Sequence, residues 1–211
     1  MSILIGIVGG SGSGKTTLAD GFVRFHAEIG SLLLSQDDYY RGLPPGTAAE
    51  DYNFDEPAAL DLEALAADLE QLRAGRGVWA PRYDFALHRR RPEPQRLEPA
   101  ALIVVEGLFL FASARLRAVF DLKFFVDVPA AECLRRRVAR DVRERGRAEA
   151  EIVAQFERQV EPMYRLHVEP TRAFADYVLA LPHPDDRAYC EQVLEMWRRV
   201  EELLTVRTVR P

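Results

Sequence analysis

The sequence predicts an α/β fold in which a parallel sheet of five strands is covered by helices on both faces. Short apolar runs alternate along the chain with stretches of helical periodicity. The apolar runs show no polar alternation, which is typical of parallel strands buried on both faces. A glycine-rich segment joins the first apolar run to the first helical stretch. These three features together favour a doubly wound sheet.

The expected elements follow in chain order. Strands are expected at 3–8, 31–35, 101–107, 122–128 and 176–181. Helices are expected at 16–29, 56–75, 130–144, 150–164 and 185–204. The segment 78–98 is rich in aromatic residues and arginine and breaks the alternation, so we expect a β-hairpin or a long loop there. The chain has no internal repeat, and we expect one domain over 1–211.

Composition excludes several classes of partner. The 211 residues are 48% hydrophobic with a mean hydropathy of −0.17, and no apolar run is long enough to span a bilayer. The net charge of −5 argues against a nucleic-acid partner, because dense positive charge is local, at 88–96 and 135–147. We find no signal-peptide pattern and no metal-ligand spacing at Cys133 or Cys190, so a cytoplasmic protein with reduced thiols is expected.

The glycine-rich segment matches G-x-x-x-x-G-K-[ST] between a strand and a helix, the phosphate-binding P-loop pattern. Backbone N–H groups in such a loop surround a phosphate, and the helix N-terminus adds positive potential. Lys15 and Lys123 are the only lysines in a chain otherwise rich in arginine. A compact ammonium on a flexible stem suits the β and γ phosphates better than a planar guanidinium. The predicted nucleotide site contains Gly9, Gly10, Ser11, Gly12, Ser13, Gly14, Lys15, Thr16 and Thr17.

A P-loop predicts nucleotide binding but leaves three reaction classes open. A guanine-specific GTPase usually carries N-K-x-D, and the only asparagine, Asn53, precedes a phenylalanine. A motor or clamp usually has a strand that ends in Asp or Asp-Glu, whereas the strand at 101–107 contains only Glu106 as its acid. A small-molecule kinase needs an acid near the acceptor hydroxyl and an arginine-rich lid. The remaining motifs favour this third class.

Acidic residues follow two of the expected strands. Asp37 and Asp38 come directly after the strand at 31–35, and Glu106 lies at the end of 101–107. Ligands of open α/β sheets bind at the carboxyl ends of the strands. We therefore expect Asp37 to orient a hydroxyl and accept its proton, and Thr16 and Glu106 to hold Mg²⁺. For Asp38, capping of the next helix is an equal alternative.

Arginines recur in the helix expected at 130–144 and just beyond it. Arg136, Arg140, Arg143 and Arg147 follow helical spacing, and Arg137 and Arg145 lie to the side. Such a face beside a phosphate loop would stabilise charge on a transferring phosphoryl group. Taken alone, the run would equally suit a solvated face paired with Glu132, Asp141 and Glu144.

These motifs in this order resemble the uridine kinase (uridine–cytidine kinase) family over residues 3–181. The stretches that carry the resemblance are GGSGSGKTT, LSQDDYYR, NFDEPAALD, PRYDFALHRR, VVEGLFLF, FDLKFFVDV, RRRVARDVRERGR, QFERQVEPMY and EPTRAFADYVL. The resemblance implies a P-loop NTPase fold with a β-hairpin insertion (78–98) and an arginine-rich lid (130–149). It further implies transfer of the γ-phosphate of ATP or GTP, with Mg²⁺, to the 5′-hydroxyl of a pyrimidine nucleoside.

The resemblance also implies roles for individual residues. Asp37 matches the catalytic aspartate, beside Lys15, Arg140 and Arg145. Asp55 matches the acid that holds the ribose hydroxyls, and Tyr83, Phe85 and His88 match the hairpin that receives the base. The substrate set implied in full is Tyr40, Asp55, Tyr83, Phe85, His88, Arg137, Arg147 and Gln155.

The chain departs from the family pattern in ways that leave the acceptor open. Glu56 stands where the family usually has histidine, and LALPHPDD (179–186) replaces the usual Pro-Arg-Gly after the last strand. A kinase for another small alcohol, such as nicotinamide riboside, pantothenate or a ribose phosphate, is the alternative, and a nucleotide-binding regulator without transfer activity is another. The family tends to form oligomers, and the apolar stripe of 185–204 fits either the core or a subunit interface.

Overall fold

The computed structural model describes residues 2–49, 52–180 and 187–208, with side chains of the last segment described over 191–205. Five parallel strands form its central sheet in the order β2-β7-β1-β8-β9. The strands are β1 (Ile3–Gly9), β2 (Ser31–Ser35), β7 (Leu102–Gly107), β8 (Leu122–Asp127) and β9 (Tyr177–Ala180). Because β1 lies in the middle and the chain winds outward from it in both directions, the predicted doubly wound sheet is confirmed.

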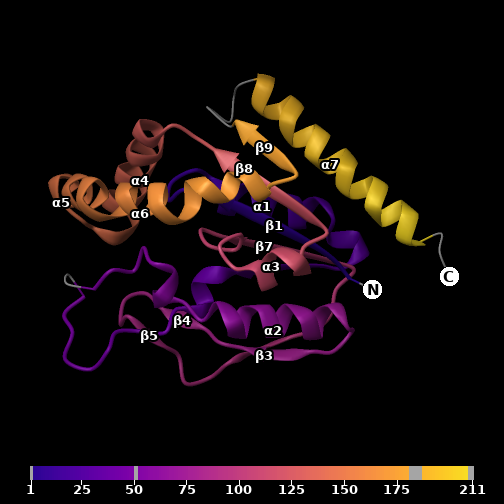
Figure 1. Ribbon diagram of the computed structural model, residues 1–211, viewed down its shortest axis with the longest axis horizontal. Helices are drawn as coiled ribbons and strands as arrows, with labels where there is room; N and C mark the ends of the chain where they lie inside the picture. Colours follow the sequence, from indigo (N-terminus) through magenta and orange to yellow (C-terminus); the bar gives the residue numbers. More distant parts are fainter. Residues whose placement is uncertain (1, 50–51, 181–186, 209–211) are drawn as a thin grey trace.

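Apolar residues of β1 serve two cores, one on each face of the sheet. Ile3, Ile5 and Ile7 pack with the first and last helices, whereas Leu4 and Val8 pack on the opposite face. Figure 1 shows α2 on one side of the sheet and α7 on the other. The covering helices are α1 (Lys15–Phe25), α2 (Leu62–Arg73), α3 (Ala114–Val119) and α7 (Arg187–Thr208).

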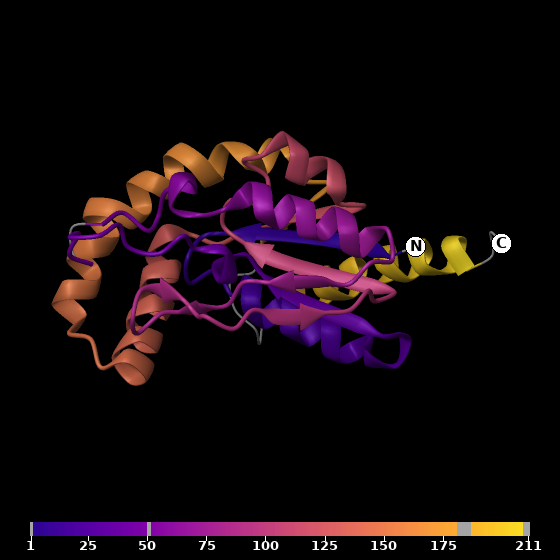
Figure 2. The same ribbon diagram turned by 90° about the horizontal axis from the view of Figure 1, so that it is seen from below.

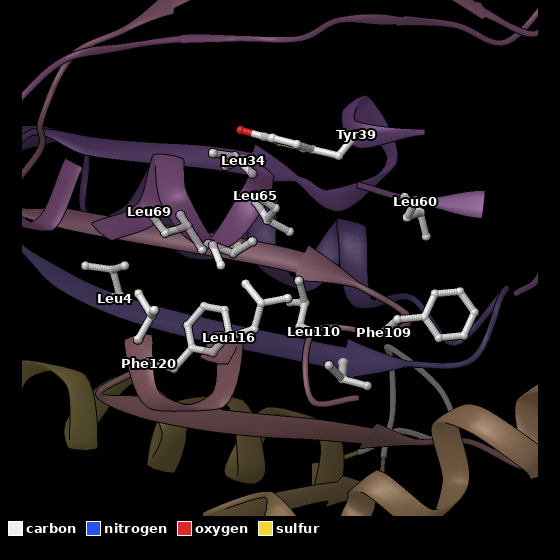
Figure 3. Packing of buried hydrophobic residues seen from close by; sticks show 14 of the residues in the cluster. Leu4, Leu34, Tyr39, Leu60, Leu65, Leu69, Phe109, Leu110, Leu116 and Phe120 are labelled. Carbon is white, nitrogen blue, oxygen red and sulfur yellow. The ribbon is translucent and has the colours of Figure 1, made fainter. Parts of the chain in front are cut away.

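The core beneath α2 is closely packed. Leu65 and Leu69 of α2 are fully buried. Both side chains face the sheet, where Leu4 and Leu34 lie (Figure 3). Asp61 caps this helix by accepting a hydrogen bond from the Ala64 N–H, 3.3 Å away. The predicted helix at 56–75 therefore starts later, because 57–59 forms a separate 3-10 turn.

The predicted hairpin at 78–98 is confirmed and consists of two successive two-stranded ladders. The outer ladder pairs β3 (Val78–Ala80) with β6 (Gln95–Leu97), and the inner ladder pairs β4 (Tyr83–Asp84) with β5 (Arg89–Arg90). Leu43 N–H donates to the His88 carbonyl oxygen at 3.1 Å. This bond ties the inner ladder to the loop that follows Asp37.

A long helical segment from 130 to 174 lies at one end of the sheet (Figures 1 and 2). It contains α4 (Ala130–Arg145), α5 (Glu149–Gln155) and α6 (Glu161–Met163), with π-helical turns at Phe156–Val160 and Tyr164–Val168 and a 3-10 turn at Glu169–Phe174. The prediction of a helix that stops at 164 was therefore too short. Pi-helical turns within a helix often accompany functional sites.

The bounds of the first helix and the packing of the last helix refine the prediction. The first helix ends at Phe25, short of the predicted 29, and α3 was not predicted. In α7, Met196 and Val200 are buried against the sheet, so that part of the apolar stripe belongs to the core.

No helix within the described ranges is long and apolar enough to cross a membrane. Cys133 is a buried free thiol, whereas LPHPDD at 181–186 and the Cys190 side chain lie outside the described residues.

The packing under α2 leads to a stability prediction. Leu69→Ala should lower the free energy of unfolding by about 2–5 kcal/mol, because a fully buried leucine leaves a cavity. Leu194→Ala is the matched control on a residue that is 48% exposed, and it should cost less than about 1 kcal/mol. Urea denaturation followed by circular dichroism measures both. Equal losses in the two variants would contradict the described packing.

Candidate functional site

The phosphate loop follows β1 and is fitted closely against α4. Gly12 and Gly14 have φ of +86° and +91°, conformations that favour glycine. A Cβ atom on Gly12 would lie 2.3 Å from the Cys133 carbonyl oxygen. Gly14 is the N-cap residue of α1, so the backbone N–H groups of the first turn are not covered by a side-chain cap. These features leave the loop with free donors at a helix N-terminus, as an anion site requires.

Side chains of the loop divide into buried and exposed groups. Lys15 is 9% exposed and its Nζ atom donates to the Gly10 carbonyl oxygen at 3.5 Å. Ser13 is buried with its Oγ unpartnered among the described residues. Thr16 and Thr17 are exposed in the first turn of α1. The lysine therefore lies folded back over the loop, within reach of a bound phosphate.

A chain of hydrogen bonds connects the loop to the acids at the strand ends. Thr16 Oγ1 donates to Glu106 Oε2 at 3.1 Å, and Ser35 Oγ donates to Glu106 Oε1 at 2.5 Å. The Asp37 N–H then donates to Ser35 Oγ at 3.3 Å. The structure thus brings together Thr16, Glu106 and Asp37 through Ser35, which the sequence analysis did not identify as a site residue.

The Asp37 carboxylate is poorly stabilised as an anion. Its Oδ1 atom is buried and has no hydrogen-bond partner among the described residues. Burial, the largest cause, and the Glu106 carboxylate together raise the pKa of Asp37 from 3.8 to about 6, although the Lys15 ammonium opposes the shift. Asp38 and Asp55 add smaller repulsions. An acceptor oxygen kept free and poised near neutral pH suits a proton acceptor.

The fold family implies Mg²⁺, and the donor set at this point fits the ion. Thr16 and Glu106 provide a hydroxyl and a carboxylate, both hard oxygen donors, 3.1 Å apart. Within the ranges described, no group of three or more His, Cys, Asp and Glu side chains could hold a metal ion. Mg²⁺ in kinases is bound by one or two carboxylates together with substrate phosphates and water, so a sparse protein set is suitable.

Aromatic side chains line the acceptor side between the loop after β2 and the hairpin. Tyr40 and Tyr83 have ring centroids 5.2 Å apart, and Phe54 stacks on His88 at 5.0 Å with an interplanar angle of 29°. His88 has φ of +49°, in the left-handed region that residues other than glycine seldom occupy. Phe85 is 51% exposed and lies edge-on to Tyr83 at 5.2 Å. The predicted residues Tyr40, Tyr83, Phe85 and His88 therefore share one aromatic wall.

Polar contacts hold this wall in place. Asp38 Oδ1 accepts from the Tyr83 N–H at 3.2 Å. The sequence predicted for Asp38 either a role in the site or the capping of the next helix, and this contact with the hairpin was not predicted. Gln159 donates to Asn53 Oδ1, and Asn53 in turn donates to Glu56, the residue that replaces the family histidine. The π-helical turn at 156–160 is thus linked to the loop that carries Asn53 and Glu56, here called the acceptor loop.

Asp55 lies on the acceptor loop between the aromatic wall and the basic groups. Its side chain is half-buried, and its N–H donates to Asn53 Oδ1 at 3.1 Å. Burial raises the pKa of Asp55, whereas the Arg137 guanidinium and the Lys15 ammonium lower it. The predicted ribose acid therefore shares the electrostatic environment of the predicted phosphate site.

The arginines of α4 are grouped differently from the prediction. The helix ends at Arg145, and Gly146 takes the left-handed conformation with φ of +62°, so Arg147 lies beyond the helix. Arg143 is exposed and pairs with Glu144, away from the others. The predicted face of Arg136, Arg140, Arg143 and Arg147 is therefore wrong. The arginines that converge are Arg137, Arg140, Arg145 and Arg147, the four that the family resemblance implied.

Two arginines connect this group to the loop and to the next helix. Arg137 is buried, and its Nη1 donates to Ser11 Oγ at 2.9 Å. Gln155 Oε1 accepts from both Arg137 and Arg147, at 3.2 and 2.9 Å. Burial lowers the pKa of Arg137, and the Asp55 and Asp141 carboxylates oppose that shift. Gln155 thus contacts the basic group directly.

Known proteins are similar to this chain over most of its length. A family model described as phosphoribulokinase / uridine kinase family matches residues 4–185. A uridine kinase from Brevibacillus brevis is 38% identical over 180 residues, which cover 84% of each chain.

Solved structures also share the fold. A possible uridine kinase from Bacillus stearothermophilus matches with a TM-score of 0.59 at 22% identity, covering 84% of this chain and 88% of the other. The phosphoribulokinase from Rhodobacter spheroides matches with a TM-score of 0.61 at 17% identity, covering 89% and 74%. With the phosphate loop, the strand-end acids and the arginine group in place, this chain belongs to the phosphoribulokinase / uridine kinase family.

Proposed function

We propose that the protein is a kinase that transfers the γ-phosphoryl group of ATP to the 5′-hydroxyl of a pyrimidine nucleoside, uridine or cytidine. The observation that carries the proposal is the buried Oδ1 of Asp37, which has no hydrogen-bond partner among the described residues, on a residue whose backbone N–H is linked to the phosphate loop through Ser35 and Glu106. A protein that only binds nucleotide has no need of an acid held in this way. Similarity to uridine kinases supports the choice of acceptor.

On the donor side, Lys15 and the loop N–H groups hold the β and γ phosphates. Thr16 and Glu106 would hold Mg²⁺, which would supply positive charge to offset that of the phosphates. Arg140 and Arg145, with Arg137 and Arg147, neutralise charge on the transferring group, a contribution that is electrostatic and so depends on their placement. GTP would meet the same groups, so the donor base is a separate question.

On the acceptor side, Asp37 accepts the hydroxyl proton as the oxygen bonds to the γ-phosphorus and the bond to the leaving ADP oxygen breaks. Asp55 accepts hydrogen bonds from the ribose hydroxyls, a task for which a carboxylate has enough lone pairs. The base stacks on the aromatic wall of Tyr40, Tyr83 and Phe85. His88 then meets the polar edge of the base, and as a neutral imidazole it can donate to uracil or accept from cytosine.

The experiment that tests the function measures ADP release with Mg-ATP and a panel of acceptors. The panel contains uridine, cytidine, adenosine, nicotinamide riboside, pantothenate and ribulose 5-phosphate. We expect release with uridine, cytidine or both, and background release with the others. Release with only a non-nucleoside would overturn the assignment of the aromatic wall and Asp55. No release above background in a protein that binds ATP would overturn the kinase proposal for these acceptors.

Asp37→Asn should lower kcat by about 10²–10⁴-fold, because an amide cannot take the hydroxyl proton. The dissociation constant of Mg-ATP, measured by titration calorimetry, should remain within about threefold of the wild-type value, since the loop is unchanged. Asp38→Asn is the matched control. Its amide oxygen still accepts from the Tyr83 N–H, so turnover should persist. Near-normal kcat in Asp37→Asn would remove Asp37 from the reaction.

The raised pKa of Asp37 predicts that Asp37→Asn, which lowers turnover, raises the stability of the fold. The folded state holds the proton up to about pH 6 and the unfolded state only to about 3.8, so this group makes the protein less stable as pH rises between those values. Asp37→Asn should therefore be about 3 kcal/mol more stable than wild type at pH 7, and equally stable near pH 3.5. Denaturation at both pH values measures this. A variant less stable at pH 7 would contradict the described burial.

A further inference from the structure

One buried carboxylate contacts all four converging arginines. Asp141 on α4 is 0% exposed. Its Oδ1 accepts from Arg140 Nε at 2.8 Å and lies 3.5 Å from Arg145 Nη1. Its Oδ2 lies 3.7 Å from both Arg137 Nε and Arg147 Nη1. Residues on the helix, at its end and beyond its end thus meet at a single acidic side chain.

This contact separates the converging arginines from the rest of the basic segment. Arg135 and Arg136 pair with Glu132, and Arg143 pairs with Glu144. None of these three is within ion-pair distance of Asp141 among the interactions described. Of the four arginines on Asp141, Arg137 and Arg147 donate to Gln155, and Arg137 also donates to Ser11 of the phosphate loop. The carboxylate therefore groups arginines of the helix with those at and beyond its end, whereas Arg136 reaches the Ser13 carbonyl oxygen of the loop without it.

The backbone of Asp141 has a related role. Its carbonyl oxygen accepts the N–H groups of Gly146 and Arg147, the latter at 3.3 Å. These bonds end the helix and turn the chain so that Arg147 returns toward the carboxylate. Both the side chain and the main chain of Asp141 thus act on the same turn.

The carboxylate is not fully satisfied by its partners. Oδ2 of Asp141 and Nε of Arg137 are both buried, and neither has a hydrogen-bond partner among the described residues. At 3.7 Å the two atoms attract one another by charge without a formed hydrogen bond. A guanidinium held in this way keeps donors for a second anion, whereas a tight bidentate pair would use them.

We propose that Asp141 is a positioning residue that holds Arg137, Arg140, Arg145 and Arg147 together as a phosphate-facing group before the nucleotide binds. The proposal rests on the proposed kinase function. Four guanidinium groups this close repel one another, and the shared carboxylate offsets that repulsion without occupying all their donors. The arginines then meet the transferring phosphoryl group already ordered, as electrostatic catalysis requires.

Asp141→Asn tests the role of the charge, because the amide preserves the size of the side chain, the oxygen facing Arg140 and the backbone carbonyl. We expect kcat with the best acceptor to fall by about 10- to 100-fold, the scale on which residues that orient others act. The dissociation constant of Mg-ATP should stay the same or decrease, since the pocket loses a negative charge. Glu144→Gln is the matched control on the same helix and should behave as wild type.

Two kinetic outcomes would overturn the proposal. One is a kcat for Asp141→Asn close to that of wild type. The other is a parallel loss of kcat and ATP affinity with a lowered unfolding midpoint, which would make Asp141 structural only. Asp141→Ser provides a second neutral variant, and if neither variant folds the residue is likewise structural. A wild-type protein without turnover would count against the proposed function instead.

A readout independent of turnover completes the test. Phenylglyoxal modifies free guanidinium groups, and mass spectrometry of peptides gives the rate at each arginine. In Asp141→Asn the four arginines should react faster than in wild type, whereas Arg73, which pairs with Asp121 elsewhere, should not change. Unchanged rates at the four, or a rise at Arg73 as well, would overturn the positioning role.

Discussion

The site depends on the close fit between the phosphate loop and the start of α4. Gly12 passes the Cys133 carbonyl so closely that any side chain would collide with it. This contact fixes α4 beside the loop, and Arg136 and Arg137 then reach the loop residues Ser13 and Ser11. Because the same helix continues to Asp141 and the turn at Gly146, the position of the whole arginine group follows from one backbone approach.

Electrostatics on the two sides of the site are unequal. Burial is the chief cause of raised pKa values at Asp37, Asp38 and Asp55. Because a raised carboxyl pKa lowers the free energy of unfolding once the group is ionised, the acids on the acceptor side make the fold less stable at neutral pH. On the donor side, Asp141 lies among four arginines and offsets part of their repulsion. Crowded acids next to crowded bases are typical of sites that sacrifice stability for function.

The sequence predicted what is local or set by topology. The five parallel strands and the P-loop followed from apolar runs and one motif, and Asp37 and Glu106 followed from the rule that strand ends gather ligands. Helical spacing grouped Arg143 with Arg147 wrongly, because the left-handed Gly146 ends the helix between them and Asp141 gathers neighbours that no fixed spacing relates. Ser35 and Gln159 carried no motif, and the six-residue α3 is too short for a periodic signal.

Transfer of the γ-phosphoryl group to a nucleoside hydroxyl, and not hydrolysis, is the central event of the proposed reaction. Phosphorus NMR of the protein with Mg-ATP and uridine observes this directly, because it distinguishes the two fates of the γ-phosphorus. We expect a new monophosphate signal, coupled to the 5′ protons of the ribose, to grow in step with ADP. Growth of inorganic phosphate in its place, or an unchanged ATP spectrum, would contradict the account.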